Sequence, residues 1–372
     1  MKKILIGSIL LYLIFSLPAA ATPAKTDKQT QSSQDTSYRL INADHLFLSK
    51  VNNEYITELL GNVHFFYGEA EFWTNRSLIW EKQKVARMEG NVKVKRDTLY
   101  LEADSVVYYR SQDKMNLGSH VYVKETHPDK TIRTFRASNA EYHPREKRLI
   151  CQDSVAFYDQ REKMYGTCGY FLYKEKDGYG YLMKDPVVYA TGKDSIRISS
   201  DKMEYFRQFS KLIATFNVKA NTSDYQATSD FLIYLNHESK AVFTGSPRFY
   251  SSFGNAQAVN FYLYFDNREL KRAVLEDSCI VNFSEEEGKT PTDWCRAKYI
   301  TMFFENREIR RFDAESDVSY HYVQEQTDKK DYANNDATGA HLTITFKPDN
   351  KVDIMKMEKQ IKGKYKFKNN KT

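Results

Sequence analysis

The sequence predicts an elongated, all-β protein, and three observations support this fold class. A short motif returns roughly every 32 residues along most of the chain, which is typical of proteins built from stacked repeats. Within each copy the apolar residues fall at alternate positions, as they do on strands whose two faces meet different surroundings. No stretch shows the spacing of an amphipathic helix. We therefore expect about ten strand–turn–strand repeats in a stack, each burying its apolar face against its neighbours.

The clearest copy of the motif spans residues 103–123. It begins with Ala103-Asp104, continues with apolar residues at alternate positions, passes a polar turn at 111–114 and returns through Gly118. Both strands carry apolar side chains on one face and polar side chains on the other. This pattern is typical of antiparallel sheet that is buried on one side.

The other copies differ in quality. Further copies begin near residues 43, 75, 138, 200, 229, 258 and 297, and the weakest begin near 171 and 339. Because the pattern is degraded at 160–195, the repeats could form one long unit or two units divided there.

Composition agrees with a sheet protein and excludes some functions. Aromatic residues make up 14% of the chain, with 27 Tyr and 23 Phe, and such side chains favour half-buried, pleated surfaces. The formal net charge is +6. So small an excess, spread along the chain, does not indicate a nucleic-acid partner.

The amino terminus has the pattern of an export signal. Two lysines precede an apolar run at residues 4–17, which is short for a membrane span, and an alanine-rich cleavage site follows at 19–21. We interpret residues 1–21 as a cleaved signal peptide and the polar residues 22–37 as a flexible linker. This predicts a periplasmic protein of a bacterial cell. The alternative is an uncleaved signal that anchors the chain in the membrane.

The carboxyl terminus changes character. We expect the repeats to occupy residues 38–325 and a degenerate last repeat with a lysine-rich tail to occupy 326–372. Seven lysines fall within 356–372. They fit a solvated edge strand, where lysine discourages unwanted strand pairing. The functional alternative is a mouth that contacts phosphate groups.

The four cysteines form two candidate disulfide pairs, Cys151 with Cys168 and Cys279 with Cys295. The midpoint of each pair falls on a polar turn between two strand patterns, so each pair is expected on adjacent strands. An oxidising compartment permits disulfides there. The alternative is four buried free thiols.

The sequence gives little sign of catalysis, and we expect no enzyme, no catalytic residue, no metal site and no cofactor. No histidine lies in a metal-ligand spacing, no nucleophile elbow or phosphate-binding glycine loop occurs, and no C-x-x-C is present. The Asp that recurs in the repeats might suggest paired carboxylates. One Asp per repeat is, however, what a turn or strand end requires.

The repeat resembles that of the OstA/LptA family, the periplasmic proteins of lipopolysaccharide transport. The residues that carry the resemblance are the steps Ala43-Asp44, Ala103-Asp104, Ser200-Asp201 and Ser229-Asp230 and the returns Gly61-Asn62-Val63 and Gly90-Asn91-Val92. The clear matches cover about residues 40–125 and 195–250, and the motif gains its specificity from its repetition behind a signal sequence.

The resemblance implies a β-jellyroll whose V-shaped strands stack into an open-ended groove for acyl chains. The residues that would line this trough are Leu46, Leu48, Val63, Phe65, Val92, Val94, Val106, Tyr108, Val121, Val123, Val155, Phe157, Met203, Tyr205, Val218, Leu232 and Tyr234. The chain is longer than a minimal bridge protein of the family, and it lacks the large carboxyl-terminal barrel of the outer-membrane member.

By resemblance, the protein would be a non-enzymatic carrier or bridge for lipopolysaccharide or a related lipid. Its partners would be other jellyroll proteins of the transport bridge, the outer-membrane assembly machinery and further copies of itself, joined head to tail. One rival hypothesis is a component of the same pathway tethered to the inner membrane. Another is a structural or adhesive β-solenoid whose apolar face is a filled core, packed to the density of protein interiors.

Overall fold

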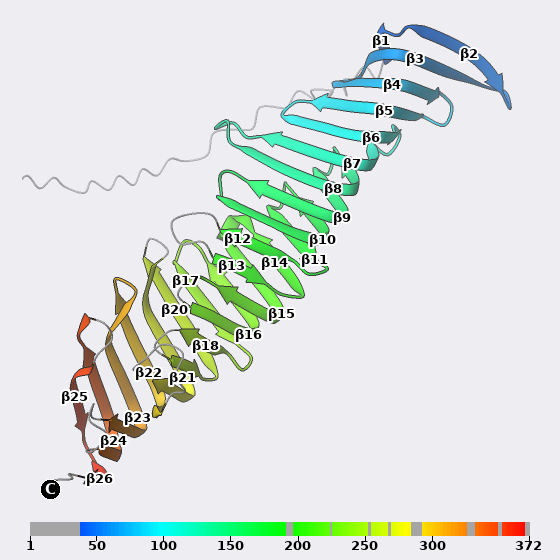
Figure 1. Cartoon of the computed structure of the whole chain (residues 1–372). Coiled ribbons are helices and arrows are strands. Elements are labelled where there is room, and N and C mark those ends of the chain that lie inside the picture. The colour runs from blue at the N-terminus through cyan, green and yellow to red at the C-terminus, as the bar shows by residue number, and fades with distance from the viewer. Residues whose placement is uncertain are drawn as a thin grey trace, which may run out of the picture.

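The computed structural model describes residues 38–190, 196–223, 225–251, 254–266, 269–283, 292–325, 332–348 and 352–368. The signal and linker predicted at 1–37 lie outside the described residues. Among the residues described, 26 strands form one antiparallel sheet, extended and twisted along its length (Figure 1). The expected all-β, elongated and open-ended β-jellyroll architecture is therefore confirmed.

The strands are β1 (Tyr38–Asn42), β2 (His45–Val51), β3 (Glu54–Tyr67), β4 (Ala70–Trp80), β5 (Val85–Arg96), β6 (Leu99–Tyr109), β7 (Lys114–Thr126), β8 (Ile132–His143), β9 (Arg148–Asp159), β10 (Met164–Lys174), β11 (Tyr179–Met183), β12 (Val187–Ala190), β13 (Ile196–Ser199), β14 (Lys202–Phe206), β15 (Lys211–Asn221), β16 (Tyr225–Leu235), β17 (Lys240–Thr244), β18 (Arg248–Ser251), β19 (Gly254–Gln257), β20 (Asn260–Asp266), β21 (Glu269–Phe283), β22 (Asp293–Glu305), β23 (Glu308–Glu325), β24 (Tyr332–Phe346), β25 (Val352–Glu358) and β26 (Lys362–Lys368). A 3-10 turn, η1 (Arg207–Phe209), precedes β15.

The ladder shifts register near the middle of every second strand or pair of short strands, where two adjacent residues adopt positive φ. In β3 the shift falls between Leu60 and Val63, and Gly61 and Asn62 have φ of 73° and 46°. Equivalent pairs stand at 90–91, 119–120, 153–154, 184–185, 216–217, 245–246, 277–278, 316–317 and 359–360. Bulges of this kind bend a strand and increase its twist. The repeat seen in the sequence is therefore a repeated bend.

The Asp of the motif supports the bend of the following strand. The Asp44 amide donates to the Gly61 carbonyl at 2.9 Å, and Asn62 Nδ2 donates to the Asp44 carboxylate at 3.1 Å. The same arrangement recurs where Asn217 Nδ2 donates to Asp201 at 2.9 Å. A carboxylate beside two αL residues satisfies polar groups that the interrupted ladder leaves without partners. The recurring Asp therefore has a structural role at the bend.

Gly61 should be among the residues of the first repeat that tolerate substitution least. A Cβ at this position would lie 2.1 Å from the Asp44 carboxylate, in addition to the strain of a φ of 73°. Gly61→Ala is expected to lower the free energy of unfolding by more than about 1 kcal/mol in urea titrations. Gly68→Ala is the matched control, since Gly68 also has positive φ (56°) but a Cβ there would meet nothing within 4 Å. Equal losses would show that Asp44 does not constrain the bend.

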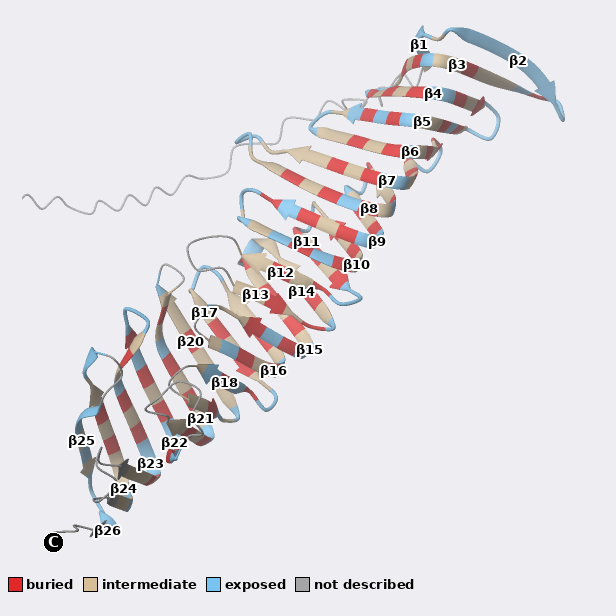
Figure 2. Cartoon of the chain, viewed as in Figure 1, coloured by how far each residue is buried: buried red, intermediate tan, exposed pale blue. Residues whose placement is uncertain are grey.

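The bends fold the sheet so that its two halves pack face to face. The turns between strands lie along two long sides of the folded sheet, which we call the first edge and the second edge. The first edge carries the turns at 81–84, 110–113, 144–147 and 175–178, and the second edge carries the turns at 68–69, 97–98 and 160–163. Rings from opposite edges touch: Phe157 stacks on Phe171 with centroids 5.4 Å apart. Figure 2 shows buried residues alternating along most of the long strands, as inward and outward positions should. We call the line where the two edges meet the seam.

The ladder continues through the region where the motif is weakest. There β10 pairs both with β11 and with β12, and the short strands β13 and β14 both pair with β15. Two short strands thus take the place of one long bent strand, with the bend at 184–185 between them. The division of the chain into one jellyroll or two, with its boundaries, stays a prediction.

The cysteine predictions need correction. Each pair does lie on adjacent strands, but Cys151 faces Phe171 and Cys168 faces Val155, while Cys279 faces Ala297 and Val281 faces Cys295. The prediction that the two cysteines of each pair face each other assumed an unbroken hairpin. A bulge intervenes in both strand pairs and shifts the register. The structure shows Cys151, Cys168, Cys279 and Cys295 as buried free thiols and not as disulfides. Burial raises the pKa of the Cys168 and Cys279 thiols to about 12, which makes them unreactive at neutral pH.

Candidate functional site

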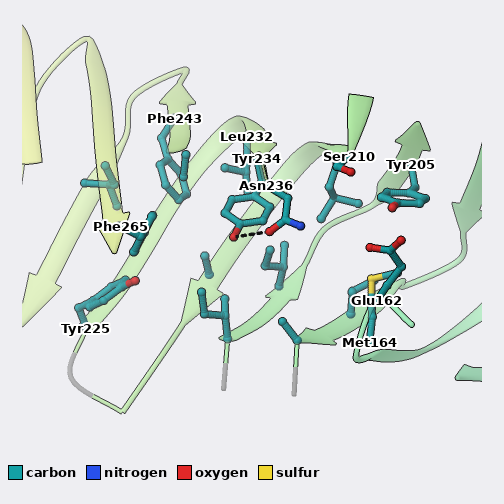
Figure 3. A pocket seen from close by; sticks show the side chains of 18 residues that line it. Glu162, Met164, Tyr205, Ser210, Tyr225, Leu232, Tyr234, Asn236, Phe243 and Phe265 are labelled. Carbon is teal, nitrogen blue, oxygen red and sulfur yellow. Dashed lines mark hydrogen bonds between the residues drawn. The ribbon is translucent and has the colours of Figure 1, made fainter. Parts of the chain in front are cut away.

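An apolar cavity of about 110 Å³ lies between the two halves of the sheet, midway along the stack. Its lining comes from the first edge, the second edge and the inner face between them (Figure 3). The lining residues are Glu162, Met164, Val188, Ala190, Ile196, Ile198, Tyr205, Ser210, Leu212, Ala220, Tyr225, Leu232, Tyr234, Asn236, Ala241, Phe243, Leu263 and Phe265. A cavity of similar order, about 150 Å³, takes up benzene in another protein, so this one can hold a segment of hydrocarbon.

Small side chains create this cavity. The second inward position after each bend holds Phe65, Val94, Val123 or Phe157 in the amino-terminal repeats, and all four are buried. In β15 the same position holds Ala220. In addition, Ala190 ends the short strand β12. The smaller side chains leave unfilled the space that Phe and Val occupy nearer the amino terminus.

Polar side chains stand only at the seam side of the cavity. Glu162 lies in the turn between β9 and β10, and in Figure 3 it faces Tyr205 of β14. Burial, and then the Glu162 and Asp159 carboxylates, raise the pKa of Tyr205 well above its usual range, so this phenol stays neutral. Ser210 Oγ lies 2.9 Å from His237 Nε2, and the Tyr234 hydroxyl donates to Asn236 at 3.4 Å. The cavity thus has an apolar interior and a polar, uncharged or anionic rim.

This arrangement suits binding better than catalysis. The Ser210 hydroxyl meets the His237 imidazole at the rim, but most of the lining side chains are apolar. Among the described residues, no group of three or more His, Cys, Asp or Glu could hold a metal ion. In the same part of the chain no helix is both long and apolar enough to cross a membrane.

The predicted trough residues fall into three groups. Tyr205, Leu232 and Tyr234 line the cavity. Most of the others face inward but are packed tightly, each at most 8% exposed: Val63, Phe65, Val92, Val94, Val106, Tyr108, Val121, Val123, Val155, Phe157, Met203 and Val218. They fill the interior where the sequence led us to expect a trough.

The third group consists of Leu46 and Leu48, which are 56% and 62% exposed. Both lie on β2, which pairs with β3 and, within the described part of the chain, with no other strand. With no described strand on its other side, β2 leaves its apolar row exposed. These two residues therefore line no enclosed groove in the isolated chain, which corrects that part of the prediction.

Sequence reasoning missed much of the cavity lining. Met164, Val188, Ile196 and Ile198 belong to the degraded repeat, where the motif gives no register. Ala220 sits in a clear repeat, two positions after Val218. The signal that could have found it was side-chain size, since Ala stands where the other copies have Val or Phe.

One comparison with known proteins, against protein-family models, gives a match. Residues 74–210 match the family model of the LptA/(LptD N-terminal domain) LPS transport proteins. The resemblance to the OstA/LptA family is thereby confirmed over that segment. No curated protein sequence matches the chain.

One solved structure with similarity to the chain is that of LptH, the LptA homologous periplasmic component of the conserved lipopolysaccharide transport device from Pseudomonas aeruginosa. The identity is 15% and the TM-score 0.25, over 38% of this chain and 79% of LptH. A TM-score of this size supports no further inference about the present chain.

Proposed function

We propose, from the premise that residues 74–210 match the LptA/LptD N-terminal family, that this protein is a non-enzymatic periplasmic carrier or bridge for lipopolysaccharide. The observation that carries the proposal is the apolar cavity between the two halves of the bent sheet, with polar groups only at its seam side. A lipid with apolar chains and a polar head fits such a site, chains inward and head at the seam.

The physical reason for such a site is the cost of hydrocarbon in water. Exposed acyl chains cost roughly 0.8 kcal/mol per CH₂, so a transport path needs apolar surface to cover them. The sugar and phosphate groups would stay in solvent outside the seam. We propose further that other jellyroll proteins of the bridge and the outer-membrane assembly machinery are the partners, reached through the open ends of the sheet.

A second candidate function rests on a different observation. Inward residues of the amino-terminal repeats, such as Phe72 and Met88, are fully buried, as in a packed core. A structural or adhesive solenoid would show this packing along its whole length, without the cavity. The third candidate, a component tethered to the inner membrane, depends on residues 1–21, which lie outside the described part of the chain.

Filling the cavity should weaken lipid binding. Ala220→Phe adds a ring at a position that is 5% exposed and lines the cavity, and it should displace at least two chain CH₂ groups. At roughly 0.8 kcal/mol each, this predicts about tenfold weaker binding of purified lipopolysaccharide in an equilibrium binding assay. Lys219→Phe, on the outward face of the same strand, is the matched control. Equal affinity of both variants, each with an unchanged melting temperature, would count against the cavity as the binding site.

A further inference from the structure

Charged and aromatic side chains join the two edges of the sheet along the amino-terminal part of the seam. Arg96, at the end of β5 on the second edge, reaches Asp113 in a turn of the first edge, with Nη1 3.3 Å from Oδ1. The carboxylate is buried, and the Tyr108 hydroxyl also donates to it at 2.7 Å. This partly buried contact therefore spans the opening between the two edges.

A second contact involves Arg110 and Tyr67. The Arg110 guanidinium is held on the first edge by the Trp80 carbonyl at 3.2 Å and Glu81 at 3.1 Å. From there it lies 5.0 Å from the centre of the Tyr67 ring, which ends β3 on the second edge. A cation over an aromatic face, largely desolvated, is an attractive contact.

The third contact is made by Arg133, at the start of β8. It is 6% exposed and is held on the second edge by Asp159, with Nε 2.7 Å from Oδ2. Its Nη1 donates to the Tyr173 hydroxyl on the first edge, and its guanidinium lies 4.8 Å from the Tyr173 ring centre. We call Tyr67, Arg96, Arg110, Asp113, Arg133 and Tyr173 the clasp.

The clasp ends where the cavity begins. Tyr173 belongs to the last long strand before the cavity, and Glu162 and Tyr205 follow it along the seam. Over the cavity the Glu162 carboxylate of the second edge acts on the Tyr205 phenol of the first edge, whereas among the described residues of 179–266 no ion pair joins the two edges. The seam is thus held by arginine contacts over the filled part of the interior and by the contact of Glu162 with Tyr205 over the cavity.

We propose that the clasp is a gate, which keeps the amino-terminal part of the groove shut and confines sideways entry of an apolar chain to the cavity. Cargo moving toward the amino terminus would require the clasp residues to separate, letting the tightly packed inner rows part. The identity of the cargo rests on the proposed function. The gate itself can be tested without lipid, so failure of the gate is distinguishable from failure of the proposed function.

The buried cysteines are built-in reporters of the gate. Cys151 and Cys168 lie inside the clasped part, on β9 and β10, whereas Cys279 and Cys295 lie on β21 and β22, beyond the cavity. All four are buried free thiols, so an alkylating reagent reaches each of them only when the surrounding structure opens. Mass spectrometry of the iodoacetamide-treated full chain gives the labelling rate at each site.

The test is a double variant, Arg96→Gln with Tyr173→Phe, which removes two polar contacts across the seam and keeps the side-chain bulk. Hydrogen bonds to charged groups are strong enough that Cys151 and Cys168 should be labelled about ten- to a hundredfold faster, with Cys279 and Cys295 unchanged. The matched control, Arg87→Gln with Tyr122→Phe, removes the outward pair of Arg87 with Glu89 and the outward Tyr122 hydroxyl, and it leaves the ring of residue 122 over Arg136.

Three outcomes decide the matter. Faster labelling confined to Cys151 and Cys168, with the control unchanged, supports the gate. No acceleration at these two sites would overturn it. An equal acceleration at all four thiols would also overturn it, because the clasp would then stabilise the whole sheet without acting as a local gate.

Discussion

Replacing Phe72 with alanine is expected to lower the free energy of unfolding by about 3–5 kcal/mol, the usual cost of removing a large aromatic side chain from a packed core. Phe72 has no exposed surface, and it stacks on Phe65 with ring centroids 4.9 Å apart. It also lies 5.9 Å from Tyr108 of the opposite edge. The substitution therefore removes contacts within one half of the sheet and across the interior.

Urea unfolding followed by tryptophan fluorescence measures this loss, since Trp73 and Trp80 lie on the same strand, β4. Phe303→Ala is the matched control, because Phe303 is 37% exposed and faces outward. It should cost much less. A similar, small loss for both variants would mean that the amino-terminal interior is not a packed core, and the distinction between filled and hollow repeats would fail.

The second large effect is expected at Arg133. Arg133→Met removes the partner of two carboxylates, Asp159 at 2.7 Å and Glu125 at 3.2 Å, and the exposed fractions of these side chains are only 6% and 13%. Removing one member of a buried ion pair costs about 3–5 kcal/mol because the remaining charge is left unpaired away from water. The same urea titration measures the effect.

An exposed pair gives the comparison for Arg133. Arg87→Met breaks the contact of Arg87 with Glu89 at 2.7 Å, in which the arginine side chain is 55% exposed. Exposed pairs contribute about 0–1 kcal/mol, so this variant should unfold almost like the natural protein. If the two variants lost equal stability, Arg133 would not be the buried anchor of the clasp.

Short-range pattern was enough to predict the strands and their faces. Val92, Val94, Val121 and Val123 alternate with polar residues, and a one-residue slip would have exposed them, so their inward position follows from the sequence. The bends were present in the sequence as the Gly-Asn returns, exemplified by Gly61. Two αL residues in succession favour Gly and Asn. The structure shows that the Gly-Asn return forms the bulge at which the strand bends.

What could not be predicted depends on contacts between residues far apart in the chain. Arg133 and Tyr173 meet only because the sheet folds on itself, and no periodicity indicates that pairing. The cavity depends on the small volume of side chains such as Ala220, which stands in a position class that the pattern treats as uniformly apolar. The exposure of Leu46 follows from its place on β2, which has no described strand on its other side.

Site-specific photo-crosslinking of the exported protein, in a cell that makes lipopolysaccharide, tests most directly whether the cavity holds acyl chains. A photoreactive residue would replace Tyr205 or Tyr234 in the cavity lining, and Glu204 or Ile233, their outward neighbours on the same strands, in the controls. We predict lipopolysaccharide adducts at the two inward positions and none at the outward ones. Folded, exported protein that forms no adduct at either inward position would contradict lipid carriage by the cavity.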